Sequence, residues 1–222
     1  MKYYNIGLSD NISVIGCYPQ TERTKKNEYH INSYNSELKV ANYEFPEFTP
    51  KYGIDLCKNA IATDILDRAT LDFGLVVNER VKNILENYIL PPHRFYPINV
   101  FGQSKYDYYW FHYITPFNSI INIENCEIEV FDKYDFIIIE ILRFNNLSEL
   151  QSFSKEMIFD PNNDIRYKSI QLKSTFPKYD LFEITGAQYF TLISAKLKER
   201  LDIENITGLE FLEYSKVNFS HH

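Results

Sequence analysis

Two histidines are the side chains in this sequence that could carry acid–base chemistry. His93 lies in "PPHRFYP", and His112 lies in the aromatic stretch "YDYYWFHY". Asp107 is close to His112 in sequence, but residues five apart on a strand point to opposite faces, so the two cannot act as an acid–base pair within that strand. We therefore expect both imidazoles to be structural groups. An enzyme of unrecognised type that uses His93 or His112 in an aromatic pocket is the alternative.

Motifs that would assign a reaction or a cofactor are absent. The sequence contains no H-E-x-x-H, no P-loop, no G-x-S-x-G and no G-x-G-x-x-G, each of which positions a defined group for its chemistry. Its three cysteines, Cys17, Cys57 and Cys126, form no C-x-x-C pair, which argues against a zinc knuckle or a thioredoxin site. The sequence predicts no catalytic, cofactor-binding or metal-binding residues, and its cysteine usage fits a reducing cytoplasm.

The charge balance restricts the class of partner. The 222 residues carry 23 basic and 30 acidic side chains, a formal net charge of -7. Such a surface repels nucleic acid and anionic lipid and favours a basic protein. No apolar run approaches the ~20 residues of a membrane span, and the start has no signal-peptide pattern. We expect a cytoplasmic protein with neither nucleic acid nor membrane as partner. Its oligomeric state stays open. His221 and His222 match the remnant of a purification tag and receive no role.

Short strands separated by a few amphipathic helices must position these residues. A loosely helical apolar pattern predicts a helix over residues 55–69. Residues 136–142, "FIIIEIL", are almost continuously apolar and predict a central strand buried on both faces. The next segment, "NNLSELQSFSKEMIF", predicts a helix that Ser148 and Gln151 would begin as a capping box.

The clearest unit is a strand, a helix and a second strand. After "FGLVV", Asn78 is placed to cap a helix over "ERVKNILENY", whose apolar residues recur at helical spacing. Pro91 and Pro92 are expected to stop that helix, because proline lacks a backbone donor. The segment "FYPINVFG" then resumes an extended chain.

A second copy of this unit follows at a shift of 116 residues. The segment "YFTLISAKLKERLDIENITGLEFLE" aligns without a gap with "FGLVVNERVKNILENYILPPHRFYP". In this alignment Ser194 matches Asn78 as a helix cap, and Gly208 is expected to cap the second helix at its C-terminal end. Each copy has an apolar helix face that cannot be buried alone, which favours two copies on a shared sheet. Chance similarity of two amphipathic units is the alternative.

The predicted fold class is α+β, with mixed or antiparallel sheets, a few amphipathic helices and two related strand-helix-strand units. We expect one domain over residues 1–222. Within it, residues 1–70 would form a strand and loop region, and residues 71–222 a region with repeat units near 73–97 and 189–213.

An aromatic stretch and an acidic stretch are the candidates for partner contacts. Alternation over "YDYYWFHY" divides the aromatic side chains between both faces, which is typical of an inner strand in the core. A face left open to solvent would bind protein, with Tyr108 and Trp110 as anchors. Further along, Glu127, Glu129 and Asp132 form either a solvated strand face or a patch that docks a basic protein.

The segment "LVVNERVKNILENYILPPHRFYPI", followed by "YDYYWFHYI" and "SIINIENCEIEVF", resembles a family of bacterial immunity proteins from polymorphic toxin systems. The ending "LFEITGAQYFTLISAKLKERLDIENITGLEF" resembles the second repeat of that family. The likeness covers roughly residues 70–215, and residues 1–50 show no recognisable pattern. It implies a two-repeat α+β protein that binds and neutralises a cognate toxin stoichiometrically, without catalytic residues. A non-toxin interaction module, such as an assembly partner, is a further hypothesis.

Overall fold

The computed structural model describes residues 1–102 and 104–220 and has an α+β fold with mixed sheets. His221 and His222, the tag candidates, lie outside the described residues. The chain groups into two compact units, each discontinuous in sequence. Unit 1 comprises Met1–Asn5, Thr115–Ala195 and the residues from Leu212 onward; unit 2 comprises Ile6–Ile114 and Lys196–Phe211. The expected division near residue 70 is not among these boundaries.

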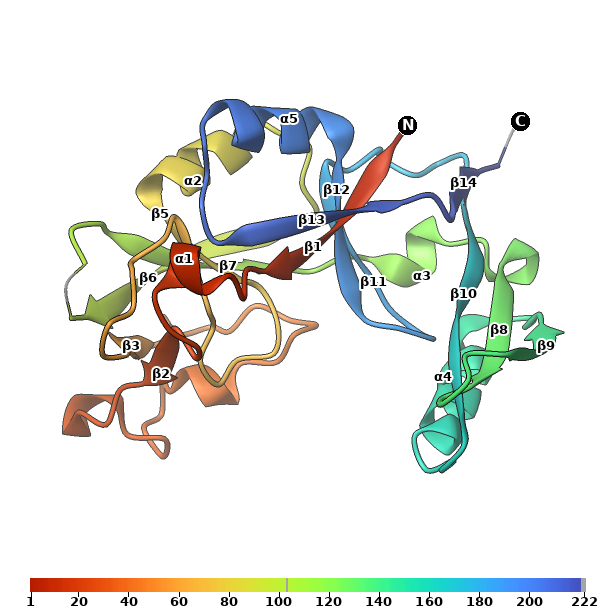
Figure 1. Cartoon of the computed structure of the whole chain (residues 1–222), viewed down its shortest axis with the longest axis horizontal. Helices are drawn as coiled ribbons and strands as arrows, with labels where there is room; N and C mark the ends of the chain where they lie inside the picture. The colour runs from red at the N-terminus through yellow and green to blue at the C-terminus, as the bar shows by residue number, and fades with distance from the viewer. Residues whose placement is uncertain (103, 221–222) are drawn as a thin grey trace. The chain divides into compact units, whose positions relative to one another are not determined.

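Unit 2 is built on a six-stranded sheet of order β2-β3-β6-β7-β5-β4 (Figure 1). Its strands are β2 (Thr21–Arg23), β3 (Gly53–Leu56), β4 (Ile65–Leu66), β5 (Leu75–Asn78), β6 (His93–Phe101) and β7 (Tyr108–Tyr113). Neighbouring strands pair antiparallel, except that β3 and β6 run parallel. Helix α2 (Glu79–Leu85) joins β5 to β6 and packs on β5 and β7, and the short helix α1 (Ile12–Ile15) precedes β2.

Strand β7 lies inside this sheet and is covered on both faces. On one face Trp110 packs between Tyr52 and Tyr96, with ring centroids 6.0 and 5.7 Å away. On the other face Phe111 stacks on Phe95 at 4.7 Å. Aromatic rings hold large apolar areas in the core of a sheet. The prediction that the aromatic stretch forms an inner strand is confirmed for Tyr108–Tyr113, whereas Tyr106 is exposed and precedes the strand.

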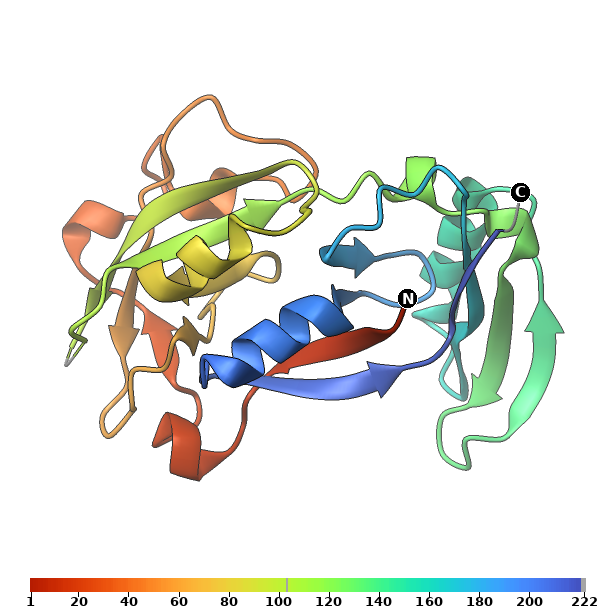
Figure 2. The same ribbon diagram turned by 90° about the horizontal axis from the view of Figure 1, so that it is seen from above.

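Unit 1 contains a four-stranded sheet of order β14-β10-β8-β9 (Figure 2). Its strands are β8 (Glu127–Asp132), β9 (Ile138–Leu142), β10 (Asn163–Leu172) and β14 (Val217–Phe219). Strand β8 pairs antiparallel with β9 and β10, whereas β14 runs parallel to β10. Helix α4 (Leu147–Met157) packs on β10, and α3 (Phe117–Ile120) precedes β8. The core of this unit includes the fully buried Ile128, Leu150, Tyr167, Leu172 and Phe182.

A second four-stranded sheet has the order β11-β12-β1-β13. Its strands are β1 (Tyr3–Leu8), β11 (Leu181–Ile184), β12 (Phe190–Ser194) and β13 (Leu209–Tyr214). Helix α5 (Ala195–Ile203) joins β12 to β13. The chain therefore contains two strand-helix-strand units, β5-α2-β6 and β12-α5-β13, where the sequence predicts them. They belong to different sheets, so the expectation of two copies on a shared sheet is wrong.

The two units match in where their elements begin. Helices α2 and α5 begin at Glu79 and Ala195, and strands β6 and β13 begin at His93 and Leu209, so both pairs differ by the predicted shift of 116 residues. The strand before each helix also has an equivalent antiparallel neighbour, β4 in one copy and β11 in the other. The repeat therefore extends one strand further than the aligned sequence.

The hairpin that precedes each helix has the same register in both copies. Ile65 of β4 pairs with Val77 of β5, and Leu181 of β11 pairs with Ile193 of β12. Each residue of the second pair lies 116 positions after its counterpart in the first. A shared register is a more specific likeness than a shared apolar pattern, because a slip by one residue would exchange the two faces of the strand.

An aspartate holds the residue before each helix. In the first copy Asn78 donates a side-chain hydrogen bond to Asp64 Oδ1 at 2.9 Å, and in the second the Ser194 hydroxyl donates to Asp180 Oδ1 at 2.6 Å. The carbonyl oxygens of the same two aspartates accept from the backbone N–H groups of Asn78 and Ser194, both at 2.8 Å. The junction of strand and helix is thus stabilised by the same side-chain chemistry twice.

Strand β1 supplies the middle strand of the second copy. The orders β4-β5-β7-β6 and β11-β12-β1-β13 correspond, so β1 takes the place of β7. The Tyr108 hydroxyl donates to the Thr63 carbonyl at 2.6 Å, and the Tyr3 hydroxyl donates to the Tyr179 carbonyl at 3.3 Å. Thr63 and Tyr179 are again equivalent at the shift of 116. The N-terminal residues therefore belong to the repeat, although they precede both copies in the chain.

The helix predicted over residues 55–69 is wrong. This segment contains the end of β3 and the whole of β4, with turns between them. Ile65 and Leu66 are neighbours in sequence and both buried, because β4 pairs with β5 and both of its faces are covered. A short apolar run of this kind cannot be assigned by periodicity alone.

Helix α4 begins earlier than predicted, and its cap is Asn146 instead of Ser148. Asn146 Oδ1 accepts from the Glu149 backbone N–H at 2.9 Å, while the Glu149 carboxylate accepts from the Asn146 side-chain amide at 2.8 Å. The bond from Glu149 to Asn146 is the N-cap half of a capping box, but the Glu149 carboxylate returns to the side chain of Asn146 and to the Asn145 N–H instead of the Asn146 N–H. The predicted capping box at Ser148 and Gln151 is therefore wrong, although a side chain does cap the helix two residues earlier.

Helix α2 has the predicted cap but not the predicted stop. Asn78 Oδ1 accepts from the Val81 N–H at 3.1 Å. The helix ends at Leu85, well before Pro91, and the next N–H groups turn back onto the last carbonyls of the helix. The two prolines lie in the connection to β6, so they do not end the helix.

Helix α5 is closed by Asn205 instead of Gly208. Asn205 has a φ of 52°, and the Ile206 N–H donates to the Leu201 carbonyl at 3.0 Å. This six-residue bond around a left-handed residue is a Schellman motif. Gly208 is needed for a different reason: a Cβ at this position would lie 2.0 Å from the Ile65 carbonyl oxygen.

Candidate interaction surface

His112 is enclosed by aromatic rings in the core of unit 2. Its ring stacks on Trp110, with centroids 5.2 Å apart, and meets Phe45 and Phe73 edge-on at 5.0 Å each. Burial lowers the pKa of His112 to about 4, because it disfavours the charged form. The imidazole is therefore neutral near pH 7, and it is 0 % exposed. This position suits a structural group.

His93 is partly buried at the start of β6. Its Nδ1 lies 2.9 Å from the carbonyl oxygen of Pro91, and its ring meets Phe95 and Phe111 edge-on at 5.5 Å each. These contacts fix the ring against the aromatic face between β6 and β7. The structure therefore does not bring the two histidines together in one pocket: they lie on opposite faces of this sheet, in separate packing environments.

Two of the three thiols, Cys57 and Cys126, lack the lowered pKa of an activated nucleophile. Burial raises the pKa of Cys126 to about 11, and burial also raises the pKa of Cys57. Reactive cysteines have lowered pKa values instead. Across residues 1–102 and 104–220, no group of three or more His, Cys, Asp or Glu side chains is arranged to hold a metal ion.

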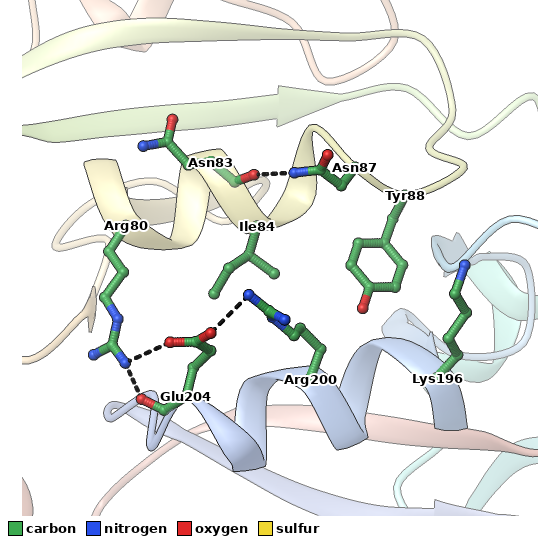
Figure 3. Close-up of a pocket in the computed structure, with 8 residues that line it drawn as sticks. All are labelled: Arg80, Asn83, Ile84, Asn87, Tyr88, Lys196, Arg200 and Glu204. Carbon is green, nitrogen blue, oxygen red and sulfur yellow. Dashed lines mark hydrogen bonds and ion pairs between the residues drawn. The ribbon is translucent and has the colours of Figure 1, made fainter.

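A groove of about 590 Å³ lies between helices α2 and α5 (Figure 3). Three cationic side chains and one carboxylate give it a net positive lining in an acidic chain, which would suit an anionic ligand. The residues that line it are Arg80, Asn83, Ile84, Asn87 and Tyr88 on the α2 side and Lys196, Arg200 and Glu204 on the α5 side.

Each cationic side chain in the groove has a partner in this structure. The Glu204 carboxylate lies 3.0 Å from Arg80 Nη2 and 2.7 Å from Arg200 Nη2 (Figure 3). Lys196 Nζ lies 4.9 Å from the centre of the Tyr88 ring, a cation–π contact. Arg80 and Lys196 are equivalent in the repeat, as are Glu204 and Tyr88, so the contacts Arg80–Glu204 and Lys196–Tyr88 are equivalent too. The groove is therefore the contact region between the equivalent helices α2 and α5 of the two repeat copies.

The aromatic candidates for partner contacts lie inside the core. Tyr108 is 2 % exposed and Trp110 is 0 % exposed. The Tyr108 hydroxyl is bonded to Thr63, and Trp110 Nε1 donates to the Phe73 carbonyl at 3.3 Å. Because both their apolar surface and their polar atoms are used inside unit 2, these two side chains are not on the described surface.

Two of the acidic candidates are paired with basic residues of neighbouring strands. Glu129 is the cross-strand neighbour of Arg166 on β10, and their side chains form an ion pair at 2.7 Å. Glu127 lies 2.7 Å from Arg143 and 3.1 Å from Lys168. The hydrogen bond from Arg143, followed by that from Lys168, lowers the pKa of Glu127. The expected acidic patch is therefore largely neutralised, because the register of the sheet places basic residues beside it.

Asp132, the third acidic candidate, shapes the turn between β8 and β9. Its Oδ1 accepts from the backbone N–H groups of Tyr134 and Asp135, both at 2.8 Å. Its backbone carbonyl accepts from the Phe136 N–H at 2.9 Å. An aspartate whose side chain accepts hydrogen bonds from the next backbone N–H groups stabilises a turn. Here that turn leads into β9.

The apolar edge at β9 is exposed, although its sequence predicts a buried strand. Strand β9 has β8 as its one strand neighbour within the described chain and lies at the free side of its sheet (Figures 1 and 2). Exposure here is high, at 64 % for Phe136, 63 % for Ile137 and 58 % for Ile139. We call the following six exposed residues the β9 ridge: Tyr134, Phe136, Ile137, Ile138, Ile139 and Ile141.

The prediction that residues 136–142 form a central strand buried on both faces is wrong. The apolar run correctly predicts a strand, but it does not determine which strands pair with it. Pairing with β8 alone leaves one edge free. An exposed apolar edge promotes association, and natural proteins usually protect it. This edge is therefore the candidate interaction surface of the described chain.

Further apolar side chains lie beside the turn of this hairpin. Ile158 and Phe159, which follow α4, are 71 % and 86 % exposed. Lys133 holds their loop to the turn, because its Nζ donates to the Asp160 carbonyl at 2.6 Å and its N–H donates to the Asn162 carbonyl at 2.8 Å. The apolar surface therefore extends beyond the strand itself.

Comparison with known proteins gives no family to which these features could be assigned. No model of a known protein family matches the chain, and none of the curated proteins matches it. Within the described residues, no helix has both the length and the apolar character needed to cross a membrane.

Proposed function

We propose that this chain binds and neutralises a cognate bacterial toxin stoichiometrically, as the immunity proteins that its sequence resembles do. The β9 ridge is the observation that carries the proposal. Exposed apolar side chains on an edge strand supply the contact area and the backbone groups that a protein partner uses. The histidines and the groove support it indirectly, because their side chains are engaged within the protein.

Neutralisation by binding needs no chemistry from this chain. The complex would cover or distort the active site of the toxin through an interface of about 1,600 Å² in total. Ile and Phe side chains of the ridge would supply its apolar centre. The net charge of -7 would speed the approach of a basic toxin. In this proposal the protein acts in the cytoplasm.

Co-expression with the product of the adjacent gene tests the proposal. We expect that product to stop growth when it is produced alone, and growth to recover when this chain is produced with it. The purified pair should form a complex of equal stoichiometry by light scattering after gel filtration. If no adjacent product is toxic and none forms a complex, the proposal is wrong. A complex with a non-toxic neighbour would instead support an interaction module of another kind.

Two matched variants locate the contact. Ile137→Asp places a charge on the ridge, whereas Ile203→Asp places the same charge at the end of α5, where the isoleucine is 66 % exposed. We expect the first variant to weaken the complex about tenfold or more and the second to leave it unchanged, since truncating or charging a central apolar contact typically costs over 1 kcal/mol.

A further inference from the structure

Strand β9 offers a partner backbone groups as well as side chains. As an edge strand it carries a row of N–H and C=O groups that point away from β8. Edge strands are commonly protected by lysine, proline, bulges or inward-pointing charge. Strand β9 reads "IIEIL" and has no lysine or proline, and Glu140, on the face of the core residue Val130, is its one charge. A bulge at Ile139 interrupts the register between the pairs Val130–Glu140 and Phe131–Ile138.

The two faces of β9 present different chemistry to an added strand. Ile138 and Ile141 lie on one face, where they extend the apolar surface of Phe131. Glu140 lies on the opposite face, beside Val130. Its side chain is exposed and makes no ion pair with any residue of the described chain. A strand added to β9 would therefore place apolar side chains beside the isoleucines and one side chain beside an uncompensated carboxylate.

We propose that β9 accepts an added strand from a partner protein, and that this strand is apolar and carries a Lys or Arg that faces Glu140. The inference deepens the proposed function and rests on it, because the added strand would be a segment of the toxin. In strand addition, main-chain hydrogen bonds provide affinity and alternate side chains provide specificity. Glu140 is the residue of β9 that can provide charge specificity.

A second copy of this chain fits the edge poorly. Antiparallel pairing of β9 with itself about its centre would set Glu140 directly opposite its own counterpart. A register shifted by one pair would leave the two carboxylates on the same face as diagonal neighbours, about 7–8 Å apart. Like charges in these positions destabilise pairing, and two chains of net charge -7 also repel each other over longer distances. With a basic partner protein, a Lys or Arg opposite Glu140 and the opposite net charge would both attract instead of repel.

Two peptides test the inference on the full chain. Each is a nine-residue strand of alternating Thr and Val, with either Lys or Glu at its centre. Amide chemical shifts of the labelled chain are followed during titration at low salt, where charge effects are least screened. We expect shift changes confined to residues 137–142 and an affinity about fivefold higher for the Lys peptide, the size of a cross-strand charge pair. The variant Glu140→Lys should reverse the preference.

Glu199→Lys is the matched control, because it makes the same charge change on an exposed position of α5 and leaves β9 intact. The inference is overturned if neither peptide binds at millimolar concentration, if the shifts lie elsewhere, or if both peptides bind equally. It is also overturned if the chain alone forms a dimer in sedimentation that Ile139→Asp abolishes. A neutralising complex that forms through another surface would reject the added strand and retain the proposed function. Charge-selective peptide binding, without a toxic product from the adjacent gene, would retain the added strand and reject the proposed function.

Discussion

At the scale of single residues, the surroundings of His112 decide what its imidazole can do. Trp110, Phe45 and Phe73 enclose the ring, and burial lowers its pKa to about 4. A histidine with an ordinary pKa would change charge near pH 6.5 and could exchange protons with a substrate. Here the same residue type is held neutral, so protonation opposes the folded state.

We expect the protein to lose stability as the pH falls from about 7 to 4. In the unfolded chain His112 takes up a proton near pH 6.5, but in the folded protein it does so only near 4. Between these values the unfolded state binds more protons, so the free energy of unfolding falls as the pH is lowered. The loss from this residue should reach roughly 3 kcal/mol and level off below pH 4. Urea unfolding at a series of pH values measures it.

The variant His112→Phe separates this effect from the titration of carboxylates. Phenylalanine fills the aromatic cage and does not titrate, so the difference between the two unfolding curves isolates the imidazole. We expect the stability of the variant to depend less on pH between 4 and 6.5. Parallel pH profiles for both proteins would show that folding does not lower the pKa of His112.

At the scale of elements, the connection between α5 and β13 contains Asn205 and Gly208. Both residue types commonly follow the end of a helix, but here they have different roles. Asn205 adopts a φ of 52° and closes the helix. Gly208 has a φ of 98° and lies against the backbone of Ile65, and its carbonyl accepts from the Ser9 N–H at 3.1 Å. Glycine is thus required where three segments of unit 2 approach one another, instead of at the helix end.

Gly208→Ala should destabilise the protein. The left-handed backbone conformation alone costs an alanine roughly 1 to 3 kcal/mol, and the new Cβ would meet the Ile65 carbonyl oxygen at 2.0 Å unless the backbone shifts. Thermal and urea unfolding measure the change. Gly7→Ala is the control, because a Cβ at Gly7 in β1 has no atom within 4 Å. Similar losses for both variants would mean that Gly208 has no special role.

At the scale of the whole molecule, the fold contains a duplicated motif whose second copy is assembled from both ends of the chain. Strands β11, β12 and β13 come from the C-terminal part, and β1 comes from the N-terminus. The Ala195 N–H at the start of α5 donates to the Lys2 carbonyl at 3.0 Å, as the Glu79 N–H at the start of α2 donates to the Asp107 carbonyl at 3.1 Å. The residue next to the middle strand, β1 or β7, therefore accepts from the first N–H of the helix in both copies.

Deleting residues 1–8 should unfold the second copy in preference to the first. Without β1, strands β12 and β13 lose the neighbour between them, whereas β7 keeps its place between β5 and β6. We expect the amides of β11 and β12 to exchange with deuterium much faster, up to the rate of an unfolded segment, and those of β5 and β7 to change less. Hydrogen exchange followed by mass spectrometry measures both sets in one sample.

A synthetic peptide of residues 1–9 provides the control for this deletion. Added in excess, it should restore slow exchange in β11 and β12, because it supplies the missing strand without a covalent link. The same peptide with Tyr3 replaced by Asp should fail, since Tyr3 is 1 % exposed and packs edge-on to Phe182 at 5.2 Å. Slow exchange of β11 and β12 in the deleted chain alone would contradict the equivalence of β1 and β7.

Local patterns predicted the parts of this fold that depend on local interactions. Asn78 caps α2 because its side chain bonds an N–H three residues away, and β7 is an inner strand because aromatic residues fill both of its faces. The positions of Asn146 and Asn205 were missed because several polar residues near a helix end compete for the same backbone groups. Residues 55–69 were predicted as a helix but contain the end of β3 and the whole of β4. Their apolar pattern fits a helix as well as a strand, and only pairing with neighbouring strands distinguishes the two.

The sequence by itself determined the α+β class, the strand-helix-strand repeat and the lack of a recognised catalytic motif. These follow from hydrophobic periodicity, capping chemistry and residue inventory, which act over a few neighbouring positions. Tertiary structure alone decided that β1 completes the second copy, that Tyr108 and Trp110 are buried, and that Glu127 and Glu129 are neutralised. It also decided that an apolar strand lies at an edge. Strand neighbours are chosen by contacts between distant segments, and an apolar run is equally compatible with a buried centre and an exposed edge.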